Sequence, residues 1–116
     1  IELIKKREDQ AKSIAKKSKF LKPSFLRLPD NRLDTVPFLK IVKFLESEIK
    51  IFHPDTVFTH FENDLNIDHQ IAYKAVLTAT RPHSKTFVKK ICCFETPSST
   101  EFNFTRKQKK LTSLKC

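Results

Sequence analysis

Apolar residues recur at helical spacing in three parts of this chain, and each part predicts a helix. Over residues 38–49 they fall at i, i+3, i+4, i+7 and i+11, which makes one continuous apolar face that must pack against a core. A second helix is predicted to run to residue 80, and either Asn66 or Asp68 can cap its start. A thinner apolar stripe among lysines over residues 2–19 predicts a helix at the surface.

Short runs of β-branched and aromatic residues separate these helices. Residues 25–28 and 56–59 predict short strands, and residues 87–94, which are apolar apart from two lysines, predict a strand buried on both faces. Strands that alternate with helices are typical of α/β proteins with a parallel sheet. Residues 106–116 show no period, so we expect one folded domain over residues 1–105 and an unstructured basic tail after it.

The net charge of +10 comes from the two ends of the chain, because residues 1–22 and 106–116 each carry an excess of +5. A protein that reads nucleic acid usually carries basic residues on its folded body, interleaved with aromatic side chains. We therefore expect no nucleic-acid partner. The chain also has no glycine, which excludes glycine-rich phosphate loops and dinucleotide-binding turns.

The cysteines and the hydropathy pattern bear on where the protein resides. The number of cysteines, three, is odd, and the neighbours Cys92 and Cys93 lie in an apolar run, so we expect buried thiols in a reducing compartment. No apolar stretch approaches the roughly 18 residues of a membrane-spanning helix, and the first residues lack the apolar core of a signal peptide. These features favour the cytoplasm.

Residues 60–69 hold the strongest candidate chemistry. This polar segment follows a predicted strand and contains two histidines and three carboxylates, at the position where α/β sheets place ligand sites. Side chains in the first turn of a helix point back toward its N-terminal end, so we expect His69 beside His60 and Asp64. This grouping suits a cation and supplies part of a zinc site. The alternative is that both histidines are ordinary loop residues beside a capped helix.

Five blocks of the sequence, together with one arginine, share a pattern with a known family. The blocks are residues 54–60, 64–69 and 75–82, then residues 28–34 and residues 94–101. The first three together resemble the second conserved block of the LmbE-like, or PIG-L, family of zinc-dependent N-deacetylases. The fourth resembles an earlier block and the fifth a later block of its bacterial branch. Arg7, followed by Gln10 and Ala11, resembles the start of a helix that carries a substrate-facing arginine.

The resemblance implies a truncated, Rossmann-like and mostly parallel sheet with flanking helices, and a zinc ion at the carboxyl ends of its strands. It implies hydrolysis of the N-acetyl group of an N-acetylglucosamine-type conjugate, in which the metal polarises the carbonyl and activates water. His69 would be a metal ligand, and His60 and Asp68 would act in catalysis. The substrate-binding residues would be Arg7, Asp30, Asp64 and Asn66.

The sequence departs from the family pattern in two places. The A-H-P-D-D-E motif, which supplies two metal ligands and the general base in the family, is absent, and residues 53–56 lack its second carboxylate and its glutamate. Asn66 replaces a histidine that assists at the oxyanion, and Gln70 replaces an arginine that often follows the ligand. We therefore expect a central fragment that is inactive alone, in which the oxyanion role is lost or is taken by His60.

Two other functions stay open beside the deacetylase. An LmbE-like scaffold without chemistry would act as a binding or interaction protein, and the basic ends alone would make a polyanion-binding module. The expected partner is an N-acetylated amino-sugar conjugate. A second copy of the chain is also expected, because a truncated sheet leaves apolar edges that favour self-association.

Overall fold

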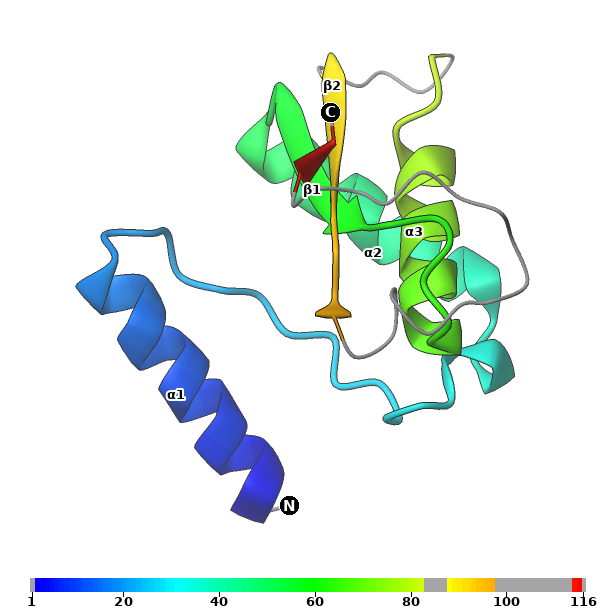
Figure 1. Ribbon diagram of the computed structural model, residues 1–116. Helices are drawn as coiled ribbons and strands as arrows, with labels where there is room; N and C mark the ends of the chain where they lie inside the picture. Colours follow the sequence, from blue (N-terminus) through cyan, green and yellow to red (C-terminus); the bar gives the residue numbers. More distant parts are fainter. Residues whose placement is uncertain (1, 83–87, 98–113, 116) are drawn as a thin grey trace.

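The structure is a computed structural model that describes residues 2–82, 88–97 and 114–115. Figure 1 shows an N-terminal helix joined by an extended segment to a body of helices and a small sheet. The elements in chain order are α1 (Glu2–Lys17), the 3-10 helix η1 (Leu33–Thr35), α2 (Phe38–Phe52), β1 (Thr56–His60), α3 (Ile67–Ala79), β2 (Lys90–Phe94) and β3 (Leu114–Lys115). The predicted α/β character is therefore confirmed for the described residues.

The sheet has the order β1-β2-β3. β1 and β2 are parallel, as the alternation of strands and helices predicts, and His60 lies opposite Phe94 at their carboxyl ends. β3 pairs with β2 in the antiparallel direction, with Leu114 opposite Phe94. β3 thus departs from the unstructured tail expected over residues 106–116, and residues 106–113 lie outside the described part of the chain.

The core forms between α2 and α3. Ile41 and Val42 of α2 cluster with Ala75 and Ala79 of α3, and Val42 and Ala75 are 2% and 0% exposed. The small alanine side chains let the two helices approach closely, so the predicted apolar face of α2 is used for packing. α3 also packs against β1, which fixes the first turn of the helix near the carboxyl end of that strand (Figure 1).

Residues 25–28 do not form the predicted strand. The segment belongs to no strand of the described sheet, and Arg27 has a φ of 22°, which lies outside the β region. The β-forming residues of this segment have no neighbouring strand among the described residues to accept their hydrogen bonds, so local preference alone does not produce a strand. The third predicted strand is confirmed over Lys90–Phe94, but the prediction that it is buried on both faces is wrong, because only Cys92 in it is buried; residues 83–87 lie outside the described residues.

α1 packs against the extended segment 24–29 that follows it. Arg27 donates hydrogen bonds from Nε and Nη2 to the Glu8 carboxylate at 2.7 and 2.9 Å, and the Lys12 ammonium lies 5.8 Å from the ring centroid of Phe25. The hydrogen bonds from Arg27 lower the pKa of the Glu8 carboxyl, and burial acts in the opposite direction. Other apolar side chains of α1 are exposed, namely Leu3, Ile4 and Ile14.

Two observations bear on the expected location. Cys92 is buried, as predicted, but it is disulfide-bonded, so the expectation of a reduced thiol is wrong at this position, whereas Cys93 forms no disulfide. Within the described ranges, no helix has the length and apolar character needed to cross a membrane. The cytoplasmic location stays a prediction.

Candidate metal centre

The end of β1 and the first turn of α3 bring two histidines together. His60 is the last residue of β1, and His69 lies in the first turn of α3, after a polar loop over residues 61–66. Their rings stack with centroids 3.8 Å apart and planes within 1° of parallel. The prediction that these two histidines lie side by side is therefore confirmed.

Asp64 organises the loop between the two histidines. Its backbone nitrogen donates to the Phe61 carbonyl at 3.1 Å, and its own carbonyl accepts from Nε2 of Gln70 at 2.7 Å. Its Oδ1 accepts from the backbone nitrogen of Asn66 at 2.9 Å. Asp64 is 0% exposed, so the hydrogen bond from the Asn66 nitrogen stabilises a carboxylate that is completely buried.

The second oxygen of Asp64 faces His69. Nδ1 of His69 lies 2.9 Å from Oδ2 of Asp64, and because an ionised carboxylate only accepts, we assign the ring proton to Nδ1 and the lone pair to Nε2. Metal-binding histidines commonly make this contact with a carboxylate. One candidate ligand atom each from His60, Asp64 and His69, here called the histidine cluster, lies within 4.8 Å of the other two. Two imidazoles and a carboxylate suit a zinc-like ion.

The environment of His60 favours the neutral imidazole. Burial lowers its pKa, the charge that His69 carries when it is protonated lowers it further, and the charge of Asp64 acts in the opposite direction. Its Nδ1 is buried and has no hydrogen-bond partner among the described residues. A neutral imidazole keeps one lone pair, which is the form of histidine that binds a metal ion. The cluster therefore fits a transition-metal ion by both its donors and its buried, unpartnered nitrogen.

Asn66 and Asp68 serve the start of α3. Oδ1 of Asn66 accepts from the backbone nitrogens of Asp68 and His69 at 2.9 and 3.4 Å, which confirms Asn66 as the helix cap. The Asp68 carboxylate accepts from the backbone nitrogens of Asn31 at 2.6 Å and Leu33 at 3.0 Å. Both oxygens of Asp68 therefore hold a loop that is distant in sequence, and this carboxylate is engaged with the backbone.

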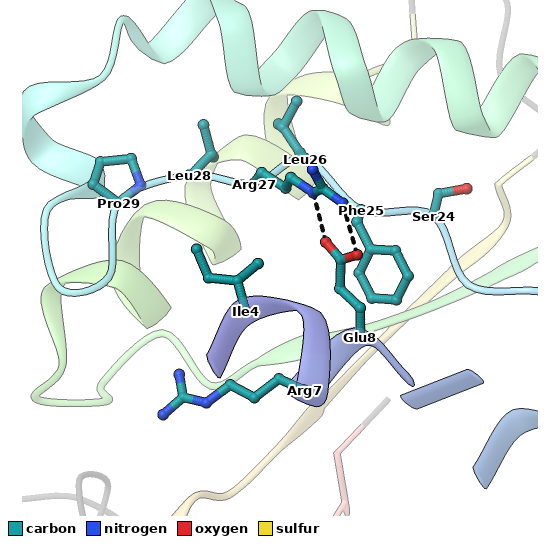
Figure 2. Close-up of a pocket in the computed structure, with 9 residues that line it drawn as sticks. All are labelled: Ile4, Arg7, Glu8, Ser24, Phe25, Leu26, Arg27, Leu28 and Pro29. Atoms are coloured by element: carbon teal, nitrogen blue, oxygen red, sulfur yellow. Dashed lines mark hydrogen bonds and ion pairs between the residues drawn. The ribbon is translucent and has the colours of Figure 1, made fainter. Parts of the chain in front are cut away.

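The remaining predicted site residues lie in other contacts. Arg7 lies in the wall of a cavity of about 500 Å³ between α1 and residues 24–29 (Figure 2), and no member of the histidine cluster lines this cavity. Asp30 is exposed beside Asn31, whose φ of 54° is a left-handed conformation that asparagine tolerates. The structure thus joins Asp30 to the start of α3 through the loop that Asp68 holds, and it places Arg7 in a separate cavity.

The burial of Asp64 bears on its expected role. The resemblance expects Asp64 to bind substrate, which stays a prediction, while in the structure Asp64 has no exposed surface and contacts His69. The signal in the sequence is the spacing, because an aspartate five residues before a histidine in the first turn of a helix can fold back onto that histidine. Spacing alone does not tell whether such a carboxylate faces solvent or the ring.

Comparisons with known proteins bear on the same residues. Residues 1–80, which contain the whole histidine cluster, match the model of a family described as PIG-L: GlcNAc-PI de-N-acetylase. Searches of curated proteins and of solved structures give no match. Residues 94–101 lie beyond the matched range, so their resemblance to a later block stays a prediction.

Proposed function

Because the chain belongs to the PIG-L family of GlcNAc-PI de-N-acetylases, we propose that it forms part of a metal-dependent hydrolase that removes the N-acetyl group from an N-acetylglucosamine-type conjugate. The observation that carries this proposal is the contact between Asp64 and His69 at 2.9 Å, which lies inside the matched residues. Hydrolysis of an unactivated amide benefits from a metal ion, and an imidazole held by a buried carboxylate is suited to bind one. By the same resemblance, β1 and β2 would belong to a Rossmann-like sheet.

In this proposal His69 binds zinc through Nε2. The metal would supply a Lewis acid for the acetyl carbonyl and a water molecule with a lowered pKa. Asp64 keeps the proton of His69 on Nδ1 and fixes the direction of the ring. The resemblance assigns two other ligands and the general base to an A-H-P-D-D-E motif, which these 116 residues do not contain. The chain therefore contributes His69 and its supporting residues to the centre.

The other residues have positioning or binding roles in this proposal. Asp68 acts as a positioning residue, because both of its oxygens hold the backbone of the loop around Asn31. Asp30, on that loop, and Arg7, in its cavity, are the proposed contacts for the sugar conjugate. His60 lies against His69 and would act directly at the metal centre.

The experiment that tests this function measures acetate release. The protein in its full native length, loaded with Zn²⁺, is incubated with N-acetylglucosaminyl-phosphatidylinositol and with a soluble N-acetylglucosamine conjugate. We expect acetate release that a chelator abolishes and that His69→Ala removes. His53→Ala is the matched control, because His53 lies outside the histidine cluster and should leave the rate unchanged. Acetate release that survives in His69→Ala would contradict the proposal.

One observation favours a second function, binding of the sugar conjugate without turnover. The side chain of Asn66, at the position of the family's oxyanion histidine, is occupied as the cap of α3 and has no imidazole with which to donate a proton. In this case the metal-loaded protein would bind the conjugate in calorimetry but release no acetate. Measuring both quantities on the same preparation separates the two functions.

A further inference from the structure

We propose that His60 is a second imidazole ligand of the ion that His69 binds, with Asp64 as the residue that positions His69. The inference rests on the proposed function only in taking the ion to be a zinc-like metal. It goes beyond the resemblance, which gives this part of the chain one ligand, His69, and leaves His60 either without a role or at the oxyanion. A role for His60 at the oxyanion is the alternative, and the test below distinguishes it from metal binding.

The first argument is the position of the two rings. Their centroids are 3.8 Å apart, and the candidate ligand atoms of the histidine cluster lie within 4.8 Å of one another. Two zinc-bound nitrogens, each about 2.0–2.1 Å from the ion, lie no more than about 4 Å apart, so ligand atoms within 4.8 Å of one another need only a small displacement to share one ion. His60 is carried on a strand and His69 on a helix, so both come from regular elements of the fold.

The second argument concerns which ring can turn. Each lone pair lies in the plane of its ring, and the two planes are parallel, so convergence on one ion requires one ring to rotate about its Cβ–Cγ bond. His69 is held in place by Asp64, whereas Nδ1 of His60 makes no hydrogen bond to any described residue. Rotation of His60 therefore breaks no hydrogen bond at that nitrogen. This torsion has a broad, low-energy range, so the ring of His60 can turn until its lone pair points toward the ion.

The third argument assigns Asp64 to positioning rather than to ligation. Oδ1 accepts from the backbone nitrogen of Asn66 and Oδ2 contacts Nδ1 of His69, so each oxygen already has a protein contact. Asp64 is also completely buried, and a buried negative charge favours a cation nearby. The ligands from this chain are therefore two imidazoles, a donor set that suits Zn²⁺, Co²⁺, Ni²⁺ or Cu²⁺ rather than Mg²⁺ or Ca²⁺.

The test is titration of the full chain with Co²⁺, followed by calorimetry and by the visible absorption of the bound ion. Cys93→Ser serves as the background, so that the Cys93 thiol adds no ligand. We expect one Co²⁺ per chain. His60→Phe keeps a ring against His69 but removes the nitrogens, and it should weaken binding at least as much as Asp64→Asn, for which loss of a supporting carboxylate predicts about 10–100-fold. His53→Ala should bind Co²⁺ as the parent chain does.

Far-UV circular dichroism checks that each variant is folded, and His60→Gln replaces His60→Phe if the latter is not. Wild-type Co²⁺ affinity in a folded His60 variant would overturn the proposal, as would a parent chain that binds no stoichiometric ion. Full metal occupancy combined with lost acetate release would place His60 at the oxyanion and would also overturn it. The titration needs no turnover, so ligation by His60 can hold even if the proposed deacetylation fails.

Discussion

The carboxylate of Asp68 accepts a hydrogen bond of 2.6 Å from the backbone nitrogen of Asn31, although 37 residues separate the two in sequence. A second bond, from Leu33 at 3.0 Å, uses the other oxygen of the same carboxylate. Asp68 therefore fixes the loop before η1 against the first turn of α3. This contact gives Asp68 a structural task that its place in a catalytic motif does not reveal.

Replacing Asp68 by alanine should destabilise the protein. Two backbone donors lose a charged acceptor, and hydrogen bonds to charged groups each contribute about 1.5–3 kcal/mol, so we expect a loss of roughly 2 kcal/mol or more in the free energy of unfolding. Urea denaturation measures this change in the free energy of unfolding. Asp68→Asn keeps one acceptor oxygen and should lose less. Asp34→Ala is the control, because Asp34 is exposed and should change stability by less than about 0.5 kcal/mol. Equal stability of Asp68→Ala and the parent would contradict this role.

The cap of α3 gives a second stability prediction. Asn66→Ala removes the acceptor for the backbone nitrogens of Asp68 and His69, and loss of such a cap costs about 0.5–2 kcal/mol. Asn66→Asp keeps a capping oxygen and should stay close to the parent in thermal and urea melts. If both substitutions cost the same, the hydrogen bonds of Asn66 do not stabilise the helix start.

Acid should release α1 from the extended segment. The pKa of Glu8 is lowered from its ordinary value of 4.5, chiefly by hydrogen bonds from Arg27. Because the pKa of Glu8 is lower in the folded protein than in the unfolded chain, the ion pair stabilises the docked helix at pH values above the unfolded pKa. This stabilisation disappears as the pH falls through the folded pKa. Amide-exchange protection of α1, measured relative to that of α2, should therefore fall below pH 4.5.

Two variants check that this loss comes from Glu8. Glu8→Gln should show weak protection of α1 already at neutral pH, with little further change on acidification. Asp9→Asn, which alters an exposed neighbouring carboxylate, should keep the pH dependence of the parent. A parent profile that is flat between pH 7 and pH 3 would mean that the Glu8–Arg27 pair does not hold α1.

Local pattern predicts the helices and the placing of the histidines well. The apolar face of α2 and the cap at Asn66 depend on neighbours in sequence, and so does the position of His69 relative to His60. The composition of residues 25–28 favours a strand, yet a strand also needs a neighbouring strand to pair with, which no local pattern supplies.

Contacts between distant residues account for what the sequence could not predict. The bonds from Asn31 and Leu33 to Asp68 join segments more than 30 residues apart, and they support the proposed positioning role of that carboxylate. Asp64 shows the same limit, because aspartate is rarely buried without partners and its burial depends on how the whole loop folds. Residue type and spacing therefore locate the site, while long-range contacts decide what each side chain does there.

The central claim, a metal-dependent deacetylase centre that includes His69, is tested most directly by returning metal to the chelator-stripped native protein while acetate release is measured. Activity should be absent without metal and should rise in proportion to added Zn²⁺ until one ion is bound at the centre, because each bound ion supplies the Lewis acid and its water. His69→Ala should give no acetate at any metal concentration. Acetate release by the stripped protein, or a titration that is unchanged in His69→Ala, would contradict the account.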